Sequence, residues 1–148
     1  MTKTIHPIAG GIGLLMILTF WISTAISELF LSTAAIVTVK TLIPWGFIIL
    51  VPALMAVGIS GMRLSKRRRG PLVERKKKRM PFIAANGILI LIPSAVYLSF
   101  NAQAGAFDTA FYAVQAVELI AGAVNIMLLS LNMLDGFRIV GKSRTRAA

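Results

Sequence analysis

The sequence predicts an all-α integral membrane protein: a four-helix bundle with four transmembrane helices and both termini in the cytoplasm. Of its 148 residues, 57% are hydrophobic, which is too apolar for a soluble domain of this size. Apolar runs of membrane-spanning length occur four times along the chain. Basic residues gather on one side of these runs, which gives the predicted bundle an orientation.

The four spans form one membrane domain covering residues 1–148. They are predicted at about 8–30, 41–62, 81–100 and 109–133. The first follows a short polar stretch, and Pro7 suits the start of a helix. We expect this first helix to be retained, because it is longer than the apolar part of a signal peptide and no clean cleavage site follows it.

Prolines mark the second and third spans. Pro44 and Pro52 lie in the second, and Pro81 and Pro93 lie in the third. Pro81 can open its helix. Pro52 and Pro93 are internal, so each is predicted to kink its helix by removing a backbone hydrogen bond.

Positive charge sets the predicted orientation. Fifteen of the sixteen Lys and Arg residues lie in the N-terminal tail, the 63–80 loop or the 134–148 tail, and only Lys40 lies on the other side. The positive-inside rule therefore predicts that these three segments are cytoplasmic, with the bundle in a bacterial inner membrane. Residues 63–79 are also expected to attract anionic lipids, although a topology signal alone requires such residues.

A polar face is predicted on the fourth span, centred on Glu118. Glu118 lies ten residues past Asp108, which places it roughly 15 Å deep and near the middle of a hydrocarbon core about 30 Å thick. Helical spacing places further polar or small residues on the same face, namely Gln115, Gly122, Asn125 and Asn132.

Each of the other spans has a comparable face of polar or small residues. In the third span it comprises Asn86, Pro93, Ser94, Tyr97 and Asn101. In the first it comprises His6, Gly10, Gly13, Trp21, Thr24 and Glu28, and in the second Lys40, Pro44, Met55 and Gly58. Such faces are expected to pack together in the bundle interior. Two ion pairs are predicted at its ends, Glu28 with Lys40 and Asp135 with Arg138.

Two interpretations of this polar seam remain open. The seam can be structural, with Glu118 protonated and its neighbours joining the helices by hydrogen bonds. Alternatively, Glu118 binds or translocates a small ligand, a proton or a cation. The candidate ligand-binding residues are Glu118, Gln115, Asn125, Asn86 and Tyr97.

Composition excludes several other classes of function. The chain has no cysteine and a single histidine, so thiolate metal sites and an all-histidine metal site within one chain are impossible. The net charge of +11 is concentrated beside the apolar runs, so nucleic acid is not an expected partner. No catalytic constellation is present, which argues against an enzyme.

Two alternative functions stay open beside ligand binding. The chain can be a structural or accessory subunit of a membrane complex, or a homo-oligomer whose glycines allow close helix approach. It can also be a redox protein that binds haem b or a quinone, with His6 as the one available histidine ligand for haem.

Overall fold

The computed structural model describes residues 2–67 and 70–145, and this part of the chain is helical with no strand. The helices are α1 (Thr2–Phe30), α2 (Thr33–Arg67), α3 (Pro71–Asn86), α4 (Ile92–Gln103) and α5 (Thr109–Thr145), with a π-helical turn, η1 (Gly87–Leu91), between α3 and α4. Together α3, η1 and α4 form one continuous rod. The predicted all-α four-helix fold is confirmed.

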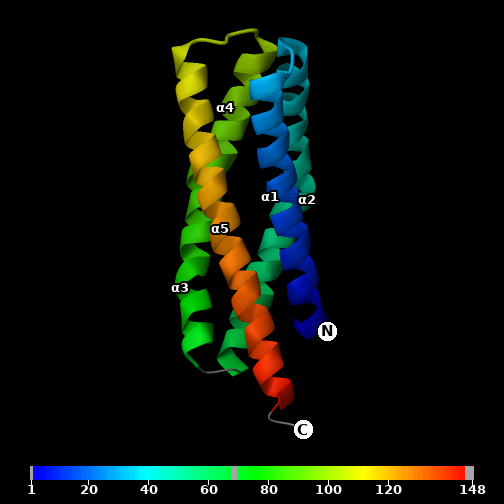
Figure 1. The fold of residues 1–148 in the computed structure, drawn as a ribbon, viewed down its shortest axis with the longest axis vertical. Helices are drawn as coiled ribbons and strands as arrows, with labels where there is room; N and C mark the ends of the chain where they lie inside the picture. Colours follow the sequence, from blue (N-terminus) through cyan, green and yellow to red (C-terminus); the bar gives the residue numbers. More distant parts are fainter. Residues whose placement is uncertain (1, 68–69, 146–148) are drawn as a thin grey trace.

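Each of the four rods is long and apolar enough to cross a bilayer, as a multi-pass membrane protein requires. The rods run up and down in alternation, and the start of α1 and the end of α5 lie at the same end of the bundle (Figure 1). We call this end, which also carries the basic residues 63–67 and 75–79, the inner end. The end with the two remaining connections is the outer end. The cytoplasmic location of the inner end remains a prediction.

The helices extend beyond the predicted spans. The segment 63–80, expected to be a loop, is largely helical, because α2 continues to Arg67 and α3 begins at Pro71. Lys and Arg are good helix formers, so a basic sequence need not end a helix. The break comes at Gly70, whose φ of 142° suits glycine, followed by Pro71 at the first helical turn.

The two outer connections are short. Only Leu31 and Ser32 join α1 to α2, so the expected 31–40 loop is replaced by helix from Thr33. Residues 104–108 join α4 to α5 and include Gly105 at a φ of 69°. Asp108 then caps α5, since its Oδ1 accepts a 2.8 Å hydrogen bond from the backbone N–H of Phe111. These short connections hold the helix ends together above the polar seam.

Packing joins α1 to α2 and α5, while the α3–η1–α4 rod packs against α5 and α2. One close approach of α1 and α2 depends on Gly46, since a Cβ there would lie 2.7 Å from Cε1 of Phe20. A central apolar layer consists of Ile17, Leu50, Ile83 and Leu129, one residue from each rod. A second apolar cluster near the outer end consists of Ile36, Leu98, Ala102 and Phe111.

The π-helical turn changes the direction in which the third rod presents its side chains. In η1 the N–H of Ile92 donates to the carbonyl of Gly87, five residues earlier, and Pro93 follows with no N–H to donate. A π turn adds a residue to the helix and rotates everything beyond it by about 100° relative to an unbroken helix. Residues before and after η1 therefore do not share the face that regular spacing predicted.

Candidate functional site

The centre of the site is a buried ion pair between α2 and α5. Nζ of Lys40 donates a 2.7 Å hydrogen bond to Oε2 of Glu118, with only 1% of the lysine and 12% of the glutamate side chain exposed. The predicted pairing of Lys40 with Glu28 is therefore wrong. It failed because α2 begins at Thr33, which carries Lys40 two helical turns into the bundle instead of leaving it in a loop.

Two further polar residues complete what we call the outer polar cluster: Glu28, Lys40, Gln115 and Glu118. Nε2 of Gln115 donates to Oε2 of Glu118 at 3.3 Å. Glu28 lies close enough to interact electrostatically with both Lys40 and Glu118. Oε1 of Glu28 and Oε1 of Gln115 are buried without a hydrogen-bond partner among the described residues. The cluster therefore contains acceptor oxygens that the described protein does not satisfy.

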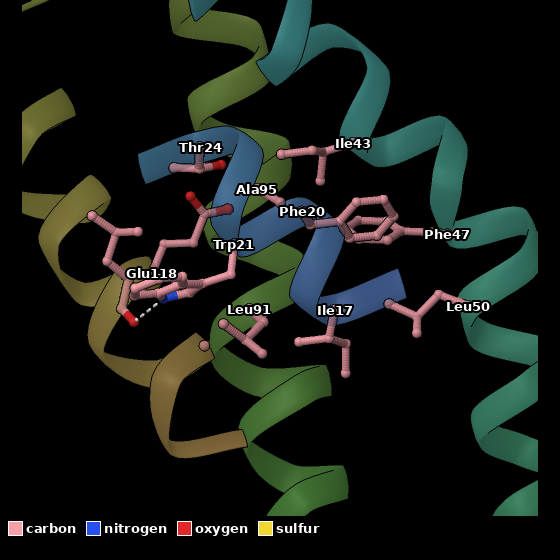
Figure 2. Close-up of a pocket in the computed structure, with 12 residues that line it drawn as sticks. Ile17, Phe20, Trp21, Thr24, Ile43, Phe47, Leu50, Leu91, Ala95 and Glu118 are labelled. Carbon is pink, nitrogen blue, oxygen red and sulfur yellow. Dashed lines mark hydrogen bonds between the residues drawn. The ribbon is translucent and has the colours of Figure 1, made fainter. Parts of the chain in front are cut away.

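A cavity of about 60 Å³ adjoins the cluster. Figure 2 shows the Glu118 side chain reaching from α5 toward α1, with the Trp21 indole beside it. Thr24 is the only other polar side chain on a lining dominated by apolar and aromatic groups, which comprises Ile17, Phe20, Trp21, Thr24, Ile43, Phe47, Leu50, Leu91, Ala95, Glu118, Leu119 and Gly122. This volume admits water-sized groups and is below the roughly 150 Å³ of an engineered cavity that binds benzene.

Trp21 forms the wall of the cavity next to Glu118 and is fixed at both ends. Its Nε1 donates a 2.8 Å hydrogen bond to the carbonyl of Leu119 (Figure 2). Its ring lies over Gly122, where a Cβ would come within 2.8 Å of Cδ1. Both residues lie on faces that were predicted to be polar, but helical spacing does not predict that the indole packs on the glycine. The Trp21 ring therefore forms a rigid aromatic wall beside the Glu118 carboxylate.

Of the predicted amides, Asn86 and Asn125 lie deeper than the outer polar cluster, on the inner side of it. Asn86 donates a 2.8 Å hydrogen bond to the carbonyl of Ala121, so it joins the third rod to α5. Asn125 is 1% exposed, and neither its Nδ2 nor its Oδ1 has a partner among the described residues. Its Nδ2 lies beside the π-helical turn, 3.8 Å from where a Cβ of Gly87 would be. Asn86 therefore has a structural partner, whereas the Asn125 amide has none among the described residues.

Asn125 provides a direct test of whether a polar group is bound at this position. Asn125→Leu is expected to raise the free energy of unfolding by about 1–3 kcal/mol if the amide is unsatisfied, because burying such a group carries that cost. Reversible unfolding in mixed micelles measures the change. Asn86→Leu is the control and should destabilise, since it removes a hydrogen bond. A loss of stability in Asn125→Leu would indicate that the amide has a bound partner.

Tyr97 does not join the other predicted site residues. It is 39% exposed, and its position follows the π-helical turn, whose rotation directs it away from the interior. Ser94 and Ser99 are the buried polar residues of α4 instead. Regular spacing predicted one face for Asn86 and Tyr97, and the extra residue in η1 separates them.

A second group, the inner polar cluster, lies near the inner end and comprises His6, Ser60, Lys76, Arg79, Asn132 and Asp135. Nη1 of Arg79 donates to Oδ2 of Asp135 at 2.8 Å. The predicted partner Arg138 is exposed instead, so this prediction is wrong. The central apolar layer lies between the two polar clusters, since Ile17, Leu50 and Leu129 fall between their residues along α1, α2 and α5.

His6, the candidate haem ligand, belongs to the inner polar cluster and is distant from Glu118 along α1. Its Nδ1 lies 2.9 Å from Oγ of Ser60, and its Cε1 is 3.2 Å from where a Cβ of Gly61 would be. The imidazole is thus packed against α2. Haem ligation and quinone binding both stay predictions.

No protein-family model, curated protein or solved structure matches this chain significantly. The case for function therefore depends on the geometry of the two polar clusters and the cavity.

Proposed function

We propose that the outer polar cluster binds one proton or one small monovalent cation. The observation that carries this proposal is its charge balance. Glu28 and Glu118 can supply two negative charges, whereas Lys40 supplies one positive charge and is committed to Glu118. An unbalanced charge in a region of low dielectric is costly, so the cluster favours uptake of one positive charge.

The hydrogen-bonding atoms support the same ligand class. The two unsatisfied atoms of the cluster, Oε1 of Glu28 and Oε1 of Gln115, are both acceptors. A proton on a carboxylate, an ammonium ion or an alkali cation satisfies acceptor oxygens, whereas an anion does not. The aromatic wall formed by Trp21 also favours a cation near its face.

Access is proposed from the outer end. The cluster lies within a few helical turns of the outer connections, while the central apolar layer separates it from the inner polar cluster. A cation entering from the outer end passes the apolar cluster of Ile36, Leu98, Ala102 and Phe111, so binding requires side chains to move there. Translocation also requires the four side chains of the central layer to separate. We further propose that the outer end faces away from the cytoplasm in a bacterial inner membrane, in accord with the basic residues at the inner end.

Trp21 provides a reporter for the test, because its indole lies beside Glu118 and the chain has only one other tryptophan, Trp45. In a Trp45→Phe background, fluorescence is recorded in detergent during titration with acid, NaCl, KCl and NH4Cl at constant ionic strength. We expect a saturable change with one of these ligands. Choline chloride, whose cation is much larger than an alkali or ammonium ion, serves as the ionic-strength control.

Matched carboxylate variants determine whether that response comes from the cluster. Glu28→Gln removes the unbalanced charge, so the saturable change should disappear while the fold is kept. Asp108→Asn alters the net charge equally but lies at the exposed start of α5, and Asn also caps helices, so its response should equal that of the parent. An unchanged response in Glu28→Gln, or no response to any ligand, would overturn the proposal.

A further inference from the structure

Lys76 is a basic residue packed inside the inner end of the bundle. It is half-buried on α3, whereas the adjacent Lys77 and Lys78 are exposed. No carboxylate of the described residues lies within 4 Å of its Nζ; Asp135 acts on it electrostatically but is paired with Arg79. Its Nζ lies beside Gly136 of α5, where a Cβ would come within 3.2 Å, so the missing side chain leaves room around the ammonium group.

The groups around Lys76 carry an excess of positive charge. Asp135 is the one carboxylate of the inner polar cluster, against two basic side chains, Lys76 and Arg79. His6 lies close enough to Lys76 to interact electrostatically and supplies a hydrogen-bonding ring. The inner polar cluster thus has the opposite charge balance to the outer one, so it favours a ligand with at least one negative charge.

The position of this cluster along the bundle fits a lipid headgroup. Arg79 and Gln103 are the ends of a helical stretch of about 36 Å at 1.5 Å per residue, slightly more than the hydrocarbon thickness. If Gln103 lies at the outer headgroups, Arg79 and Lys76 lie at the inner ones. Exposed apolar side chains at Phe82 and Phe137 mark the lipid boundary just beside them.

We infer that the inner polar cluster is a binding site for a phosphate group, with the phosphate of an anionic lipid headgroup as its source. Lys76 supplies the free ammonium, and Arg79 retains further N–H donors beyond its bond to Asp135. Basic pockets between membrane helices bind such headgroups, and the acyl chains can lie along the exposed apolar faces. This inference is independent of the cation proposed at the outer polar cluster.

Adjacent lysines provide the matched comparison. The parent, Lys76→Gln and Lys77→Gln are purified in mild detergent and titrated with short-chain phosphatidylglycerol, and bound lipid is counted by native mass spectrometry. We expect Lys76→Gln to weaken binding about fivefold, because one basic residue is lost from the site. Lys77→Gln removes the same charge from an exposed position and should bind as the parent does.

Three further measurements identify the source of the phosphate and control for misfolding of the variants. Inorganic phosphate should compete weakly if a lipid is the ligand, whereas full competition at low millimolar concentration would assign a free phosphate instead. Phosphatidylcholine, which is neutral overall, should bind less than phosphatidylglycerol. Lys76→Arg should restore binding. Equal weakening by Lys76→Gln and Lys77→Gln would overturn the inference, because a diffuse basic surface would then explain it.

Discussion

Lys40→Met is expected to lower the free energy of unfolding by about 3–5 kcal/mol, the largest effect of any single substitution proposed for this bundle. The ammonium group is 1% exposed and is paired with Glu118 at 2.7 Å. Its removal leaves Glu118 and Glu28 as two carboxylates with no cation beside them. The loss is measured by reversible unfolding in mixed micelles, near neutral pH.

Lys66→Met is the matched control, because it makes the same substitution on the same helix at an exposed position of the inner end. It should change stability by no more than about 0.5 kcal/mol. Adding Glu118→Leu to Lys40→Met should recover part of the loss, since an apolar pair replaces a stranded charge. Equal effects of the two lysine substitutions would show that the ion pair contributes nothing to the fold.

Gly122→Val is expected to destabilise the bundle by about 2–4 kcal/mol, combining overpacking with the loss of a hydrogen bond. A Cβ at this position would lie 2.8 Å from Cδ1 of Trp21. The indole cannot rotate away without breaking its bond to the carbonyl of Leu119. The displaced ring should also be visible as a changed emission maximum of Trp21 in the Trp45→Phe background.

Gly58→Val controls for the effect of a β-branched residue in a helix, because no described atom outside its own stretch of helix backbone lies within 4 Å of where its Cβ would be. Its stability should stay within about 0.5 kcal/mol of the parent, and the Trp21 emission should not move. If Gly122→Val unfolds like the parent with an unchanged emission maximum, then Trp21 does not pack on α5 as described.

Sequence reasoning predicted the four spans and the interior position of Glu118, Gln115 and Asn125, because apolar length and helical spacing are local properties of the chain. It did not predict the helix ends. Charged residues were assigned to loops, yet the helices continue through them, and this placed Lys40 in the interior rather than at a loop. The partner of Glu118 was missed for that reason.

Tyr97 and Arg138 illustrate a second kind of feature that the sequence does not predict. Tyr97 was placed with Asn86 on the assumption of a regular helix, and the π-helical turn before Pro93 rotates it to the outside. Arg138 was paired with Asp135 because the two are neighbours in sequence, but Arg79 reaches Asp135 from another helix. Hydrophobic periodicity carries no information about which helices are adjacent, so partners of this kind could not be predicted.

The central apolar layer also has an electrical consequence. Glu118 and Asp135 are separated by seventeen positions on α5, or about 25 Å, with Leu129 of the layer between them. A transmembrane voltage falls across insulating material, at about 2.3 kcal/mol per charge per 100 mV for a full crossing. If the proposed cation enters from the outer end and stops at Glu118, near mid-depth, it crosses about half of this voltage, so its occupancy should depend on voltage about half as steeply as a full crossing. Only opening of the layer would turn the same ion into a current.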